Sequence, residues 1–250
     1  MTMKELVQLA WDALTFKHEA YAQHVARADV LKRGLAVLVL ASLLAGTVSF
    51  IINFVNGLRP MDPVAQQQEV EQGLRDFVES LKAIGPVWDL PPNFDEQMLK
   101  YIRPNIEMGF RIAELNTPLP KRVGNVLESI GAFLSLPFSR LAGWIGYGVW
   151  VMLAAKLLGG RATARQMLGT TALYAAPHVL NVLSPIPCLG GLLGLVAMAW
   201  GIAIYVKALA VANGFTIGRA VVATIVPVLF FGVLAMLGML GFLIVMLMAG

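Results

Sequence analysis

The sequence predicts an all-α polytopic membrane protein with five transmembrane helices and a helical extracytoplasmic loop between the first two. Its composition is the first reason: 58% of the 250 residues are hydrophobic and 14% are charged, whereas a soluble domain has about 25% charged residues. The second reason is that the apolar residues fall into long runs, and the third is that basic residues gather at the ends of these runs.

The apolar runs give the order of the predicted elements, because a spanning helix needs about 20 mostly apolar residues. The expected spans are 35–55, about 138–158, about 166–183, about 189–206 and from about 220 to 248. We therefore divide the chain into an amphipathic cytoplasmic segment (1–34), span one (35–55), an extracytoplasmic helical loop (56–129) and a four-span membrane domain (130–250).

Basic residues near the span ends predict the orientation, since Lys and Arg favour the cytoplasmic side. Eight of them fall on one side if the N-terminus is cytoplasmic: Arg27, Lys32, Arg33, Lys156, Arg161, Arg165, Lys207 and Arg219. Lys121, Arg122 and Arg140 lie on the other side. The first two belong to a long loop, and long loops cross largely regardless of charge, while the Arg140 side chain can extend to the outer headgroups. We expect a cytoplasmic N-terminus and an extracytoplasmic C-terminus.

Amphipathic patterns predict further helices outside the spans. In the outer loop, helix starts at Asp62-Pro63 and at Asn93 precede apolar residues at helical spacing, with a kink at Pro104. Met3–Leu14 also has one apolar face. That pattern fits a helix lying in the membrane interface and equally an ordinary packed helix, so both interpretations stay open.

The stretch GGRATARQ between spans two and three predicts a capped turn. Gly159 and Gly160 fit a helix end, and Thr163 fits the cap of the next helix, with Gln166 completing a capping box. A phosphate-binding P-loop needs a lysine-serine ending and a preceding strand, and the stretch has neither. We expect Lys156, Arg161 and Arg165 to contact lipid headgroups here.

Small residues four positions apart on the spans predict close helix packing, within the chain or between copies. The pairs are Ser42 with Gly46, Gly190 with Gly194, and Ala197 with Gly201.

Polar residues inside the predicted spans are few, and His178 and Asn181 are the main candidates for a functional role among them. His178 follows Pro177 in span three, and an intramembrane ionisable group is a functional candidate by default. A structural hydrogen bond, to Asn181, Ser184 or a neighbouring span, competes with quinone, haem or proton-relay roles. His18 and His24 are six residues apart, which does not suit a shared metal site, and we expect them at the surface.

Several functional classes lack residues to support them. The lone Cys188 excludes an intrachain disulfide, and no nucleophile elbow or zinc motif is present. No carboxylate follows Glu128, which counts against an ion-coupled carrier. We therefore expect no enzyme activity, no catalytic residues, no metal and no cofactor.

The order of several motifs resembles the Yip domain family, the Ypt/Rab-interacting membrane proteins, and especially its prokaryotic branch. The motifs are LLGGRATARQ, AAPHVL, an Ile-Pro turn, W-x6-KALAVANG and TIGRAVVATIVPVL, within about Phe138–Leu229. The resemblance implies five spans with a cytoplasmic N-terminus; eukaryotic members bind Rab-type GTPases and each other in vesicle traffic. This chain has a shorter cytoplasmic N-terminal region and a long helical outer loop, so we do not carry GTPase binding over. The matching positions are Gly159, Gly160, Arg161, Thr163, Gln166, Pro177, Pro187, Lys207, Gly214 and Pro227.

Together these observations predict a non-enzymatic scaffold in the cytoplasmic membrane of a prokaryote. Its expected partners are membrane lipids and other membrane proteins or further copies of itself, with no nucleic acid. An accessory subunit of a large energy-transducing or secretion complex is the closest alternative. A small-molecule transporter, using His178, Asn181, Thr170 and Thr171, is the alternative from another class.

Overall fold

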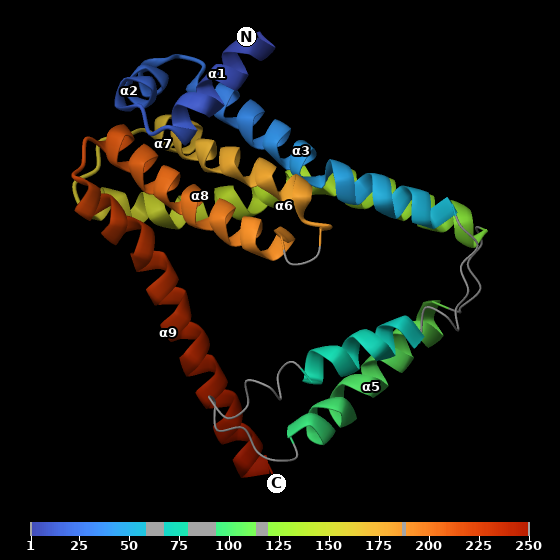
Figure 1. The fold of residues 1–250 in the computed structure, drawn as a ribbon. Helices are drawn as coiled ribbons and strands as arrows, with labels where there is room; N and C mark the ends of the chain where they lie inside the picture. Colours follow the sequence, from blue (N-terminus) through green and yellow to red (C-terminus); the bar gives the residue numbers. More distant parts are fainter. Residues whose placement is uncertain (1, 59–67, 80–93, 114–119, 187–188, 250) are drawn as a thin grey trace. The chain divides into compact units, whose positions relative to one another are not determined.

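The fold is described from a computed structural model, for residues 2–58, 68–79, 94–113, 120–186 and 189–249. All regular secondary structure in these residues is helical, as the sequence predicts (Figure 1). Residues 68–79 form a helix that precedes α5. The other helices are α1 (Met3–Leu14), α2 (His18–Ala26), α3 (Val30–Leu58), α5 (Phe94–Ala113), α6 (Lys121–Leu157), α7 (Ala164–Thr171), the 3₁₀ helix η1 (Ala172–Leu183), α8 (Leu189–Asn213) and α9 (Ile217–Ala249).

Three of the described helices are long and apolar enough to cross a membrane. They are α3, α8 and the Ile217–Leu240 part of α9. Predicted spans one and four lie within α3 and α8, and predicted span five lies within the whole of α9. The five predicted spans are therefore not all confirmed.

Predicted spans two and three correspond to helices of a different character. Span two lies within α6, which is 37 residues long, but glycines, aromatic residues, Arg140 and Lys156 dilute its apolar residues. Span three is divided between α7, with 8 residues, and η1, with 12 residues of 3₁₀ helix. The helix type changes within the predicted span. Each of the two segments is therefore shorter than the about 20 residues that one spanning α-helix needs.

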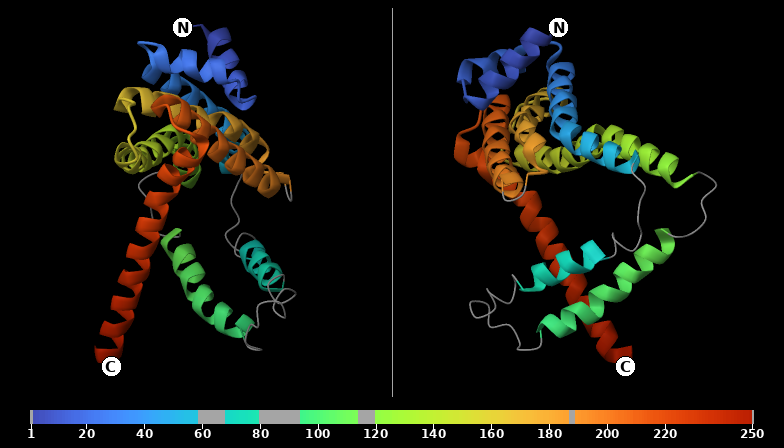
Figure 2. Two further views of the ribbon diagram at one scale, coloured as in Figure 1. Left: turned by 90° about the vertical axis from the view of Figure 1, so that its left-hand side faces the viewer. Right: turned by 45° about the vertical axis from the view of Figure 1, so that its right-hand side comes forward.

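The chain forms two compact units, Met1–Ile52 with Ile130–Gly250, and Asn53–Ser129. The core of the first unit contains many alanines, which lets its helices approach closely. Within this unit α8 packs along α7 and η1, which Figures 1 and 2 both show. The larger residues of its two hydrophobic clusters come from α1, α2, α3, α6, α7, η1 and α8: Leu6, Tyr21, Leu38, Trp144, Val151, Met167, Leu173, Ile204, Tyr205 and Leu209.

The two N-terminal helices pack on this helical bundle. Thr2 and Glu5 form a capping box that begins α1, and Leu6 and Ala13 of α1 are buried. The Tyr21 hydroxyl donates to the Ala13 carbonyl at 2.8 Å, which fixes α2 against α1. Trp200 of α8 donates to the Leu14 carbonyl at 3.2 Å. The apolar face of α1 is thus partly used in packing, while Met3, Val7 and Trp11 stay exposed.

The second unit contains the two helices predicted in the outer loop, residues 68–79 and α5. Pro104 lies inside α5. The predicted helix starts at Asp62-Pro63 and Asn93 lie outside the described residues, as do Pro187 and Cys188.

Candidate functional site

The turn between α6 and α7, residues 156–166, is named the basic turn here. Gly159 has φ +87°, a left-handed conformation that favours glycine. A side chain at Gly160 would meet the Ala155 carbonyl oxygen at 2.8 Å. Thr163 caps α7, and the Thr163 amide donates to Oε1 of Gln166. The turn therefore has one defined backbone path.

The three basic side chains of this turn are exposed, but they are not equivalent. Lys156 donates to the Gly160 carbonyl at 3.2 Å and so also closes the turn. Arg161 and Arg165 are exposed and have no ion-pair partner in the described part of the chain. These two guanidinium groups are free to contact an anionic surface.

Asn213 is the last residue of α8, and its side chain joins the basic turn to the C-terminal end of this helix by hydrogen bonds. Its Oδ1 accepts from the Ala162 amide at 3.2 Å, and its Nδ2 donates to the Leu209 carbonyl at 3.1 Å. The side chain is 5% exposed. Gly214 follows with φ +66°, as expected where a helix ends at glycine. Gly214 is one of the positions that carry the family resemblance, whereas the role of Asn213 was not predicted from the sequence. The Asn-Gly pair at the end of a helical run was the signal that could have indicated it.

Polar residues of η1 lie against the small residues of α8. A side chain at Gly201 would meet His178 Cε1 at 2.9 Å, and one at Gly194 would meet Asn181 Oδ1 at 3.9 Å. One at Gly190 would overlap the backbone of Ser184. We call this contact the glycine seam. Ala197, between Gly194 and Gly201, is fully buried.

His178 does not bond to Asn181 or Ser184, the two partners named from the sequence. Its Nδ1 lies 3.2 Å from the Tyr174 carbonyl oxygen. In 3₁₀ geometry the amide of residue 177 would bond that carbonyl, but proline has no N–H. The histidine side chain supplies the missing donor. Asn181 Oδ1 is buried without a hydrogen-bond partner among the described residues.

A cavity of about 320 Å³ opens beside His178, between α6, η1, α8 and α9. The aromatic residues Trp144, Tyr147, Tyr174 and Tyr205 are among those that line it. Trp144 donates to the Thr171 hydroxyl at 3.2 Å, and Tyr147 donates to the Thr224 carbonyl at 2.5 Å. The aromatic residues of α6 therefore hold helices together as well as lining the cavity.

The small residues of α3 also lie at helix contacts. Ser42 is buried and donates to the Leu38 carbonyl at 2.7 Å, so its hydroxyl is used within its own helix. A side chain at Gly46 would overlap Leu136 of α6. The closest crossing was not singled out from the sequence: Gly34 of α3 meets Gly169 of α7, and a side chain at Gly34 would overlap the Gly169 carbonyl.

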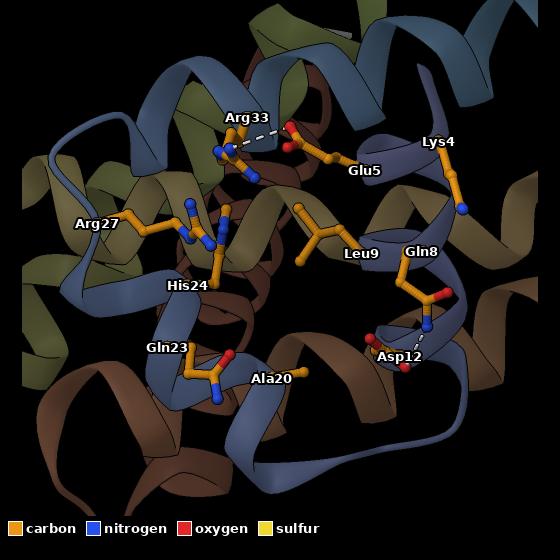
Figure 3. Close-up of a pocket in the computed structure, with 10 residues that line it drawn as sticks. All are labelled: Lys4, Glu5, Gln8, Leu9, Asp12, Ala20, Gln23, His24, Arg27 and Arg33. Atoms are coloured by element: carbon orange, nitrogen blue, oxygen red, sulfur yellow. Dashed lines mark hydrogen bonds and ion pairs between the residues drawn. The ribbon is translucent and has the colours of Figure 1, made fainter. Parts of the chain in front are cut away.

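A polar cleft of about 330 Å³ lies between α1, α2 and the start of α3 (Figure 3). We call it the N-terminal cleft. The ring of His24 stands in its middle, with Arg27 on one side and Leu9 on the other. Its remaining lining residues are Lys4, Glu5, Gln8, Asp12, Ala20, Gln23 and Arg33.

The expectation that His24 lies at the surface is wrong. Its side chain is 2% exposed, and its Nε2 lies 3.2 Å from the Gly169 carbonyl at the glycine crossing. Burial lowers the pKa of His24, and the nearby Arg33 and Arg27 lower it further, although the bond to Gly169 opposes them. The partner lies 145 residues away in sequence, so local spacing carried no signal for this contact.

A comparison with protein families shows which family the chain belongs to. A family model described as the Yip1 domain matches residues 11–240. The chain belongs to the Yip1 domain family. No curated protein and no solved structure matches it significantly. Yip1 domain proteins are generally non-enzymatic membrane trafficking proteins, and the chain is accordingly a multi-pass membrane protein.

Proposed function

We propose that this Yip1 domain protein is a non-enzymatic, five-span scaffold that organises protein partners or lipids in the cytoplasmic membrane of a prokaryote. The observation that carries the proposal is the fixed backbone of the basic turn. Asn213 and the capping box hold the turn rigid, while Arg161 and Arg165 remain exposed and unpaired in the described residues. A preorganised basic surface binds anionic lipid or protein with little ordering cost.

Length supports five spans rather than three. At about 1.5 Å per α-helical residue and about 2.0 Å per 3₁₀ residue, α7 and η1 together extend about 36 Å. That exceeds the roughly 30 Å hydrocarbon core. The part of α6 from Phe138 to Leu157 reaches about 30 Å by the same rule. Arg140 and Lys156 near its ends can extend toward the headgroups.

Cysteine labelling tests the span number and the orientation together. In a Cys188→Ser background, Arg161→Cys and Ser184→Cys lie at the two ends of the α7–η1 rod. We expect a membrane-impermeant maleimide to reach the first only from the cytoplasmic side and the second only from outside. Labelling of both from one side would refute the crossing by α7 and η1.

Co-purification tests the scaffold role. We expect the full chain, extracted in mild detergent, to retain a protein partner, a second copy or a defined lipid. Arg161→Gln combined with Arg165→Gln should weaken that association if the basic turn carries it. A strictly solitary chain that retains neither protein nor specific lipid would refute the proposal.

The transporter alternative loses support from the hydroxyls it would use. Thr170 and Thr171 are fully buried, and they donate to the Gln166 and Met167 carbonyls of their own helix at 2.7 and 2.9 Å. An accessory subunit of a larger complex keeps support from the second unit, Asn53–Ser129, because such a unit offers more surface than a linker. A large particle purified with this chain would favour that alternative.

A further inference from the structure

The N-terminal cleft presents two cations that have no ion-pair partner in the part of the chain that the structure describes. Both carboxylates in its wall already have partners: Glu5 pairs with Arg33 at 3.4 Å, and Asp12 pairs with Lys17 at 2.7 Å. Arg33 also pairs with Asp29, at 2.8 Å. Lys4 and Arg27 have no ion-pair partner within the described ranges. The cleft therefore has unused capacity for a negative charge.

The cleft also presents one buried acceptor. A carbonyl oxygen only accepts, so the His24 Nε2 that faces the Gly169 carbonyl must carry the hydrogen. In the neutral ring the other nitrogen, Nδ1, is then an acceptor. It is buried and has no hydrogen-bond partner among the described residues. A buried acceptor left without a donor costs about 1–3 kcal/mol, so a ligand that donates there would be favoured.

The surroundings of the cleft place it at the level of lipid headgroups. Arg33 lies two residues before the apolar run that begins at Leu35. The opposite face of α1 lines an apolar groove of about 390 Å³ with α3 and η1. Met3, Val7 and Trp11 on that face are each about 60% exposed. A helix with this division lies in the membrane interface, its apolar face toward the acyl chains.

We propose that the N-terminal cleft binds the headgroup of an anionic phospholipid that carries hydroxyl groups, phosphatidylglycerol being the simplest example. Arg27 and Lys4 contact the phosphodiester oxygens, and a headgroup hydroxyl donates to His24 Nδ1. The volume of about 330 Å³ falls at the lower end of the range for small-molecule sites. The inference depends on the membrane location of the chain and goes beyond its role as a scaffold.

Two lipids that differ only in the hydroxyls make the test specific. Phosphatidylglycerol and phosphatidylpropanol have the same charge, and with matched acyl chains they differ in the headgroup donors. Native mass spectrometry of the full chain in detergent, titrated with each lipid, measures both affinities. We expect about fivefold tighter binding of phosphatidylglycerol, the value of one added hydrogen bond of about 1 kcal/mol.

Two variants separate the contributions of charge and hydroxyl. Arg27→Gln should weaken both lipids about fivefold, the effect of one basic residue at an anionic surface. His24→Phe keeps an aromatic ring at this position but removes the Nδ1 acceptor, so the preference between the lipids should vanish. Arg122→Gln removes an exposed arginine outside the cleft and should change neither affinity. Arg27 is exposed, so its variant keeps the test valid even if His24→Phe does not fold.

Three results would overturn the proposal. One is equal binding of the two lipids by the unmodified chain, and another is unchanged affinity in Arg27→Gln. The third is displacement of the lipid by soluble glycerophosphoglycerol at equal concentration, which would make this a site for a free phosphodiester. These outcomes concern lipid binding in the N-terminal cleft, whereas retention of a protein partner or a second copy tests the scaffold proposal separately.

Discussion

Replacement of Asn213 by alanine should loosen the basic turn. Asn213→Ala removes the acceptor of the Ala162 amide, and Ala162 itself is 3% exposed. An amide left buried without a partner costs about 1–3 kcal/mol. The lost bond to Leu209 lies within the same helix and is easily replaced by the helical ladder. We expect a loss of about 2 kcal/mol, which corresponds to a fall in Tm of about 4–8 °C for a chain of this size.

Thermal unfolding in detergent, followed by tryptophan fluorescence at one heating rate, measures this change. A second readout is local: Arg161 and Arg165 are trypsin sites, and a loosened turn should be cut faster at the same temperature. Arg219→Ala, exposed at the start of α9, is the matched control and should leave Tm and cleavage unchanged. An Asn213→Ala protein with an unaltered Tm and unaltered cleavage would refute the role of this side chain as a fastener.

Three further predictions concern helix contacts and pH. Gly34→Ala forces a methyl group into the backbone of α7 and should cost about 1–3 kcal/mol, whereas Gly191→Ala, with open space around it, should cost nothing measurable; equal Tm values would contradict the crossing. Because the pKa of His24 is lowered in the folded protein, the unfolded chain binds the proton first. The contribution of neutral His24 to the free energy of unfolding should therefore be fully present above the pKa of the unfolded chain, about 6.5, and be lost as the pH falls below it. The slope for one group is at most about 1.4 kcal/mol per pH unit; Arg27, Arg33 and Asp29 surround the ring, and a His24→Gln protein with the same pH profile as the unmodified chain would refute this origin. Tyr147→Phe removes a bond between α6 and α9 and should lower stability by about 0.5–1.5 kcal/mol, measured by the same melting experiment; an unchanged Tm would mean that the hydroxyl does not join the two helices.

The elements that follow from local pattern are the ones that could be predicted from the sequence. Apolar runs located the helices α3, α8 and α9, because crossing a membrane requires length and hydropathy that a sequence displays directly. The capping box at Thr163 is similarly local, since both its partners lie within four residues. The motif order pointed to the family that the comparison shows.

The features that escaped prediction depend on contacts between distant residues or on helix type. His24 meets Gly169 across 145 residues, and only the packing of α2 on α7 brings them together. The glycine crossing likewise joins residues far apart in the sequence, Gly34 of α3 and Gly169 of α7. The 3₁₀ geometry of η1 is unexpected because such helices seldom exceed three or four residues; the alanine-rich sequence would favour an α-helix in isolation.

The 3₁₀ geometry of η1 makes the length of this segment more critical than its exact composition. With three residues per turn, positions three apart stack in a straight row, and His178 and Asn181 occupy one such row against Gly201 and Gly194 of α8. One inserted residue after Tyr174 would rotate everything beyond it by about 120°. Both polar side chains would then turn away from α8 together, so a single insertion here should be far more damaging than most substitutions.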